Sequence, residues 1–173
     1  MKETPNQEKC IQLLKECGCS DDIIMHCCAV RDIAKRIAIR AGADVALVEA
    51  GALLHDIGRA KTQGIQHAIE GAKIARKKGL PTTIIRIIER HIGAGIPKDE
   101  ARCLGLPNKD FLPISLEEKI VAHADNLTHG DHQQCIEDEI QKALDKGQKK
   151  HAQRLRQLHD ELSAICGIDL NEI

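Results

Sequence analysis

Residues 45–58 read VALVEAGALLHDIG, an apolar run that ends in a polar pair and a glycine. Asp44, just before it, is a good N-cap residue, so the run predicts a helix from Val45 to Ile57. His55 and Asp56 close this helix. A carboxylate buried beside an imidazole is costly unless it is paired or bound to a metal. A polar helix end with a solvated Asp56 is the simpler interpretation of the pair taken alone.

Four further side chains change that balance, because they recur on successive predicted helices. His26 lies inside the apolar stretch at residues 23–30. His67 lies near the start of one later helix, His91 at the end of the next, and Asp125 inside an apolar segment after that. Each of them alone is more often a core or surface residue than a ligand. Helical bundles build metal sites from one or two ligands per helix, so the set predicts a metal centre.

Apolar residues recur with helical spacing along almost the whole chain. We therefore predict an all-α fold in which residues 1–173 form a single domain. It would have about six core helices at 20–130 and a C-terminal helical hairpin at 131–166. The first helix is expected at Pro5–Cys17 with Thr4 as its N-cap, and Ser20 and Ser115 are expected to cap later ones. Residues 58–64 and most of 93–113 are expected to be loop, and no strand is predicted. The remaining helices are expected at 20–42, 65–78, 82–93, 115–127, 131–146 and 148–166.

The composition excludes several classes of protein. With 42% hydrophobic and 29% charged residues among 173, the chain is predicted to be globular rather than disordered. One Phe, no Trp and no Tyr leave no aromatic platforms for single-stranded nucleic acid. The formal net charge of −1 gives no global basic field. The local basic clusters at 76–78 and 149–150 are interpreted as solvated helix faces.

Membrane and secretory signals are not visible in the sequence. No apolar run reaches the roughly 20 residues of a membrane span, and the N-terminal residues are polar, so a cytoplasmic location is expected. The eight cysteines include no CxxC pair and are interpreted mainly as small buried thiols.

The order of His26, the pair His55-Asp56 and Asp125 resembles the HD-domain superfamily of metal-dependent phosphohydrolases. Residues 55–58 match the HDIG variant of its motif letter for letter. The resemblance covers roughly residues 20–130, and the chain is most similar to small stand-alone HDIG proteins of archaeal type. The resemblance implies that His26, His55, Asp56 and Asp125 hold one metal ion.

Binuclear members of that superfamily add two histidines between the HD pair and the last aspartate, where this chain has His67 and His91. Asp56 would then bridge two ions. Many of those members carry a His-His pair where this chain has Arg90-His91. Nitrogen and oxygen ligands without thiolate suit Mn²⁺, Fe²⁺, Ni²⁺, Co²⁺ or Mg²⁺, with Zn²⁺ as a further candidate.

The resemblance implies a phosphohydrolase that cleaves a phosphomonoester or phosphodiester of a nucleotide or a similar small phosphate. Metal-activated hydroxide would be the nucleophile, with Asp56 as one catalytic residue. Arg59 and Lys61, just after the motif, are the candidates for neutralising phosphate oxygens. Solvated loop cations are the alternative for both.

Two other functions remain open. One is a non-catalytic regulatory module that binds metal or nucleotide, against which the intact ligand set argues. The other is a di-iron oxygenase, because some relatives with the same ligand order oxidise C–H bonds; the lack of tyrosine and the basic residues after the HD pair argue against it. The expected partner is a small phosphorylated substrate, with no membrane and no strong nucleic-acid signal. The C-terminal helices are a candidate surface for homo-oligomerisation.

Overall fold

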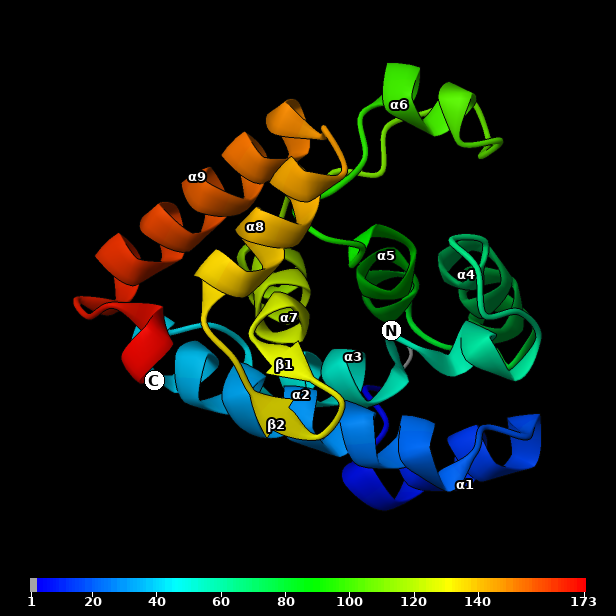
Figure 1. The fold of residues 1–173 in the computed structure, drawn as a ribbon. Helices are drawn as coiled ribbons and strands as arrows, with labels where there is room; N and C mark the ends of the chain where they lie inside the picture. The colour runs from blue at the N-terminus through cyan, green and yellow to red at the C-terminus, as the bar shows by residue number, and fades with distance from the viewer. Residues whose placement is uncertain (1–2) are drawn as a thin grey trace.

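The computed structural model describes residues 3–173, and this part of the chain is almost wholly helical (Figure 1). The predicted all-α fold is confirmed, with nine α-helices and one two-stranded antiparallel ladder in the described residues. No helix of this part is both long and apolar enough to cross a membrane. The helices are α1 (Gln7–Cys17), α2 (Asp21–Ala41), α3 (Val45–Leu54), α4 (His67–Lys77), α5 (Thr82–Arg90), α6 (Lys98–Cys103), α7 (Leu116–Asn126), α8 (Ile136–Asp145) and α9 (Lys149–Cys166).

Most of the predicted N-cap residues do cap their helices in the structure. The side chains of Ser20, Asp44 and Ser115 accept backbone N–H groups in the first turns of α2, α3 and α7. The predicted first helix is wrong at its start. Asn6, not Thr4, is the N-cap, because its side chain accepts the N–H of Lys9 at 2.9 Å.

The helix α3 ends at Leu54, one turn earlier than predicted. His55 and Asp56 therefore lie in a turn, and a 3-10 helix, η1 (Ile57–Ala60), follows where a loop was expected. This short 3-10 helix packs directly against α4. Because α3 ends early, Asp56 lies in the turn beyond it, where its Oδ1 is 3.1 Å from Nε2 of His67, the first residue of α4.

Two apolar clusters form most of the core, and α3 contributes to both. Val48 and Ala52 pack with residues of α2, α7, α8 and α9 in one cluster. Leu53 and Leu54 pack with residues of α1, α4 and α5 in the other. The helix α3 is thus buried at the centre, between α2 below it and α5 and α7 above it in Figure 1. Its C-terminal end meets the ends of the surrounding helices, which is where the HD pair lies.

The C-terminal hairpin of α8 and α9 is present, and α9 packs on α2 and α7. The chain reaches it through a short hairpin that the sequence did not predict, formed by β1 (Thr128–His129) and β2 (His132–Gln133). A second 3-10 helix, η2 (Leu170–Glu172), ends the chain. The segment with α6 projects from the body of the molecule in Figure 1 and is tied down by a bridge between Ile96 and Phe111.

Candidate metal centre

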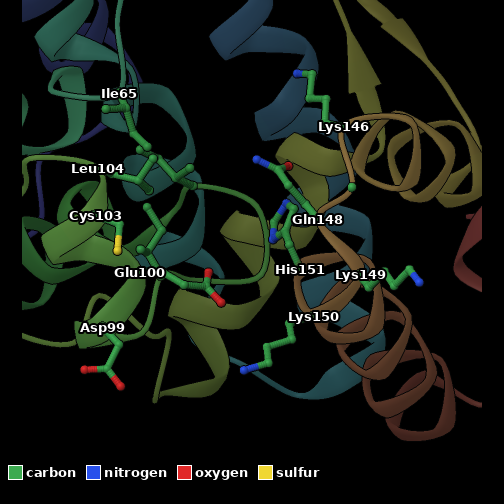
Figure 2. A pocket seen from close by; sticks show the side chains of 13 residues that line it. Ile65, Asp99, Glu100, Cys103, Leu104, Lys146, Gln148, Lys149, Lys150 and His151 are labelled. Carbon is green, nitrogen blue, oxygen red and sulfur yellow. The ribbon is translucent and has the colours of Figure 1, made fainter.

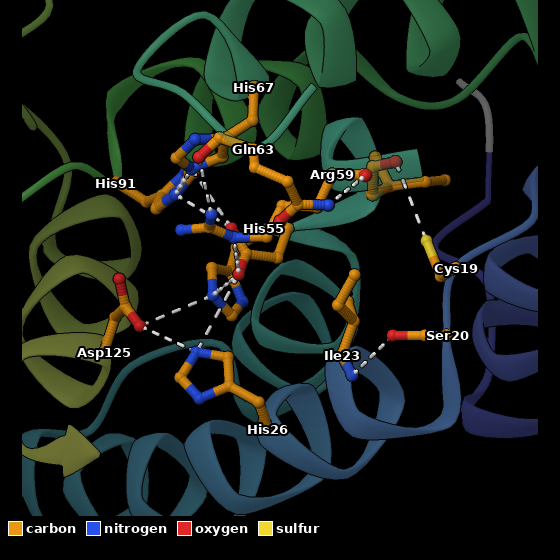
Figure 3. A network of polar contacts seen from close by, with 12 residues as sticks. Cys19, Ser20, Ile23, His26, His55, Arg59, Gln63, His67, His91 and Asp125 are labelled. Carbon is orange, nitrogen blue, oxygen red and sulfur yellow. Dashed lines mark hydrogen bonds and ion pairs between the residues drawn. The ribbon is translucent and has the colours of Figure 1, made fainter. Parts of the chain in front are cut away.

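Six predicted ligands converge just beyond the C-terminal end of α3, and Figure 3 labels five of them, all but Asp56. They come from five places in the chain: α2, the turn after α3, the start of α4, the residue after α5, and α7. The four residues contributed by the turn after α3, α4 and α5 are buried, while those of α2 and α7 are partly exposed. The centre therefore has a closed side and a side open to solvent. The six residues are His26, His55, Asp56, His67, His91 and Asp125.

The open side holds a group of three candidate ligands. Oδ1 of Asp125 lies 3.0 Å from Nε2 of His26 and 3.5 Å from Nε2 of His55. The ligand atoms of these three residues all lie within 4.8 Å of one another. A single divalent cation with bonds of about 2.0–2.6 Å fits among atoms so spaced.

The two carboxylate oxygens of Asp56 face different pairs of histidines. Its Oδ1 lies 3.1 Å from Nε2 of His67 and 3.5 Å from Nε2 of His91. Its Oδ2 lies 3.7 Å from Nε2 of His55 and 3.9 Å from Nε2 of His26. Asp56 is therefore the one carboxylate of the cluster with an oxygen toward each side.

All four histidines turn Nδ1 toward a backbone carbonyl and Nε2 toward the cluster. Nδ1 of His26 lies 2.7 Å from the carbonyl oxygen of Gly130. Nδ1 of His55, of His67 and of His91 lies 2.6, 2.8 and 2.7 Å, respectively, from a backbone carbonyl oxygen. A carbonyl can only accept, so Nδ1 carries the proton and Nε2 presents a lone pair. Histidines that bind metals are commonly fixed in this way.

Lone pairs that face one another call for a cation. Nε2 of His67 lies 3.0 Å from Nε2 of His91, and both rings already donate through Nδ1. Among the described residues, Nε2 of His55 and Oδ1 of Asp56 are buried without a hydrogen-bond partner. Orphaned buried acceptors are rare and expensive. The residues present therefore fit a divalent metal, and the cluster is consistent with metal binding.

The pKa shifts of the clustered side chains also favour the binding of a cation. Burial alone would lower the pKa of His55, but with no cation bound Asp56, Cys27 and Asp125 hold this pKa well above its usual range, so Nε2 takes up a proton that a bound cation would replace. Burial would raise the pKa of Asp56 and of Asp125, but His55 and its neighbouring imidazoles hold both well below their usual range. The carboxylates are therefore ionised, and their field attracts a positive charge to this position.

The two predicted phosphate-binding cations behave differently. Nε of Arg59 donates to Oδ2 of Asp56 at 2.6 Å, and its Nη1 donates to the carbonyl of Gln63 at 3.2 Å. Arg59 is therefore engaged with a candidate ligand, which the sequence did not indicate. Lys61 is exposed, and the structure records no ion pair for it among residues 3–173.

A model of the HD domain family matches residues 23–130, more than half of the chain. The chain belongs to the HD domain family. All six convergent side chains lie inside the matched range. The HD domain of the phosphodiesterase PgpH from L. monocytogenes, solved in complex with cyclic-di-AMP, shares the fold at a TM-score of 0.57 and 20% identity. The likeness covers 89% of this chain and 96% of that one.

Three sequence relatives of this HD domain protein come from archaea. Proteins of Picrophilus torridus and Thermoplasma volcanium, both named tRNA (cytidine(56)-2'-O)-methyltransferase, are 48% and 44% identical over all 173 residues. The chain spans 51% of the length of each. The protein MJ0778 of Methanocaldococcus jannaschii is 47% identical over 165 residues, which cover 91% of this chain and 97% of that one.

These relatives overturn the predicted hydrolysis of a small phosphate ester. Proteins that match the HD domain chain along its whole length are named for methyl transfer to tRNA, not for hydrolysis. The prediction was wrong because a cluster of imidazoles and carboxylates determines where a cation and a phosphate can lie. It does not determine which molecule carries the phosphate, or which reaction follows.

The sequence analysis missed a contact between two histidines that lie behind the cluster of predicted ligands. Nε2 of His123 lies 3.1 Å from Nδ1 of His159, whose Nε2 lies 3.0 Å from Oδ1 of Asp169. His123 is two residues from Asp125 but points away from the cluster, into the contact between α7 and α9. No spacing signal could have found this link, because 36 residues separate the two rings in sequence.

Proposed function

We propose that this chain is a metal-binding HD module that serves the 2'-O-methylation of tRNA at cytidine 56. Its partner is tRNA, and its metal centre binds a phosphate of the tRNA backbone. The methyl transfer itself is assigned to the half of the longer relatives that this chain does not cover. The identity of 48% and 44% over every residue of the chain carries this proposal.

The ligand assignment follows the two sides of the cluster. His26, His55 and Asp125 would hold one ion on the open side, together with Asp56. His67 and His91 would hold a second ion on the closed side, again with Asp56. Nitrogen and oxygen ligands of this kind suit Mn²⁺, Fe²⁺, Ni²⁺, Co²⁺ or Mg²⁺, and Zn²⁺ is a further candidate. A bound divalent ion supplies a Lewis acid that attracts and orients a phosphate oxygen.

The protein's own residues do the rest of the binding. Asp56 has its carboxylate orientation fixed by the Arg59 guanidinium at 2.6 Å, so Arg59 acts as a positioning residue. Lys61 is exposed on the same turn and free to approach a phosphate that reaches the open side. The names of the two relatives that match the whole chain specify tRNA, which favours a large polyanion over a small nucleotide as the partner. Self-association through α8 and α9 stays a prediction.

Binding of tRNA by the metal-loaded chain tests the proposal. We expect the purified protein with Mn²⁺ to bind an unmodified tRNA transcript in a filter-binding assay, and a chelator to weaken that binding at least tenfold. Asp56→Asn should weaken it similarly. Asp160→Asn is the matched control, because Asp160 is an exposed carboxylate on α9 that makes no ion pair within residues 3–173.

The role in methylation is tested in cells. In the source organism, replacing the natural gene with the Asp56→Asn allele should lower 2'-O-methylation at cytidine 56. The readout is the resistance of the phosphodiester 3' to that nucleotide to alkaline hydrolysis, since a methylated 2'-oxygen cannot attack it. Full protection in the Asp56→Asn strain, or equal tRNA binding with and without metal, would contradict the proposal.

A further inference from the structure

A cavity of about 780 Å³ separates α6 from the first turn of α9 (Figure 2). One wall is apolar and is formed by Ile65, Ile92, Ile96 and Leu104. The opposite wall is the turn between α8 and α9 and the start of α9, from residue 146 to residue 151. Figure 2 shows Gln148 and His151 reaching from that wall into the space, toward the side chains of the α6 segment. The volume is in the range of sites that take a nucleotide-sized ligand.

The rim of this cavity is basic. Lys146, Lys149 and Lys150 are exposed, and none of them has an ion-pair partner within residues 3–173. Glu100, which also lines the cavity, is neutralised by a two-pronged contact with Arg154 at 2.9 and 2.6 Å. Asp99 is the remaining acidic side chain of the lining. The cavity therefore carries a net positive charge although the whole chain carries −1.

The cavity borders the metal centre. Ile92 in its wall follows His91, and Gly93 comes next. The ring of His151 packs so closely over Gly93 that a Cβ built there would lie 2.9 Å from Nε2 of His151. Gly93 also has a φ of +57°, which favours glycine. The first turn of α9 is thus seated on the turn that carries His91.

We propose that this cavity receives a single-stranded nucleotide of RNA, with its base against the apolar wall and the flanking phosphates on the three lysines. The inference rests on the proposed function, since the RNA meant is the tRNA whose backbone reaches the metal centre. The charge and the shape select this occupant. Three unpaired cations suit a polyanion, and a half-apolar lining suits a base.

The composition of the lining predicts how such binding behaves. The chain has a single Phe and no other aromatic residue than histidine, so the base meets isoleucine and leucine side chains rather than a stacking ring. Phosphate contacts then dominate the affinity, and binding weakens steeply with salt. Each phosphate contact on a single strand contributes about 0.7 to the slope of log K against log salt concentration.

A salt titration of tRNA binding tests the lysines. Lys146, Lys149 and Lys150 are exposed, so replacing all three by Ala should leave the fold intact. We expect the slope to fall by about 2 in magnitude, as three lost contacts predict. The control removes the same charge elsewhere, by Lys9→Ala, Lys15→Ala and Lys77→Ala on α1 and α4. That control should leave the slope within about 0.5 of the natural value.

Thiol protection locates the RNA directly. Cys103 lines the cavity and is exposed, while Cys135 is also exposed but does not line it. Bound tRNA should slow alkylation of Cys103 by N-ethylmaleimide at least fivefold, as read by mass spectrometry of the metal-loaded protein, and should leave Cys135 unchanged. If both thiols are protected equally, or if neither is protected, the proposal that RNA binds in this cavity is overturned.

The two proposals fail in different ways. If the triple lysine variant binds tRNA with the slope of the control variant while Asp56→Asn still loses binding, the cavity inference is overturned and the proposed function stands. If the natural protein does not bind tRNA, both are overturned. A lower slope with unprotected Cys103 places the strand on the outer surface of α9 and also overturns the inference.

Discussion

Gly58→Ala should open the metal centre, because Gly58 is the point where η1 and α4 touch. A Cβ built on Gly58 would fall well inside contact distance of the His67 carbonyl oxygen and lie 2.5 Å from the backbone nitrogen of Gly71. Both clashing atoms belong to the backbone of α4, so no side-chain rotation can relieve them. Ordinary contact begins near 3.4 Å, so η1 and α4 must separate by roughly 1–1.5 Å.

This separation should lower the free energy of unfolding and should also disturb the predicted metal site. Overpacking of a buried position costs typically about 1–3 kcal/mol, and a clash with backbone belongs at the upper end. We expect the free energy of unfolding to fall by about 3 kcal/mol. The contact of 3.1 Å between Oδ1 of Asp56 and Nε2 of His67 spans the same gap. It should lengthen by a similar amount, which distorts the ligand geometry on the closed side, so metal should bind there more weakly.

Urea unfolding of the metal-free protein and elemental analysis of the metal-loaded protein measure the two effects separately. Gly64→Ala is the matched control, because Gly64 lies in the same segment, is exposed, has no positive φ, and leaves its Cβ 3.9 Å from Thr62 Oγ1. It should be neutral or stabilising by about 0.4–1 kcal/mol. A Gly58→Ala protein as stable as the natural one, with unchanged metal content, would refute this account of the HDIG glycine.

Four other substitutions have defined outcomes. Asp56→Asn should keep its far-UV circular dichroism and lose most bound metal in elemental analysis, because an amide oxygen offers no charge to the cation. Arg59→Ala should destabilise the metal-free protein by about 1 kcal/mol through the lost charged hydrogen bond, whereas Lys61→Ala should stay within about 0.5 kcal/mol in the same urea titration. Burial raises the pKa of Cys10 to about 12 from 9.0 in the unfolded chain. The buried Cys10 thiol therefore makes its full contribution to the free energy of unfolding below about pH 9. Above that pH the contribution falls by up to about 1.4 kcal/mol per pH unit. Cys10→Ala should flatten this alkaline loss in urea titrations between about pH 8 and 10.5, and an unchanged slope would contradict the assignment.

Local signals in the sequence were sufficient for most of the fold. Side-chain caps such as Ser20 and Asp44 mark helix starts through a single hydrogen bond to a neighbour three residues away, which sequence spacing reveals. Helical periodicity located the elements that carry the six predicted ligands. The structure brings those six side chains together, and their roles as ligands remain proposals.

The features that sequence reasoning missed depend on contacts between distant segments. The early end of α3 follows from the packing of η1 on α4, and the contact of Arg59 with Asp56 follows from that end. The basic cavity depends on how α9 lies against α6, which no spacing encodes. The lysines at 149 and 150 were visible in the sequence but indistinguishable from a solvated helix face. The net charge of −1 concealed a local positive surface because it averages over the whole chain.

The ends of α3 and α5 explain why two histidines of the cluster turn Nε2 toward Asp56. His55 and His91 are the residues that directly follow α3 and α5, and each donates Nδ1–H to a carbonyl three residues earlier, in Ala52 and Ile88. Carbonyls in the last turn of a helix have no partner within the helix, so they need such a donor. One hydrogen bond thus satisfies the end of a helix and fixes the imidazole with its Nε2 lone pair toward Asp56. The backbone that ends α3 and α5 therefore also selects the tautomer of the histidine that follows, which would preorganise His55 and His91 if they bind a metal.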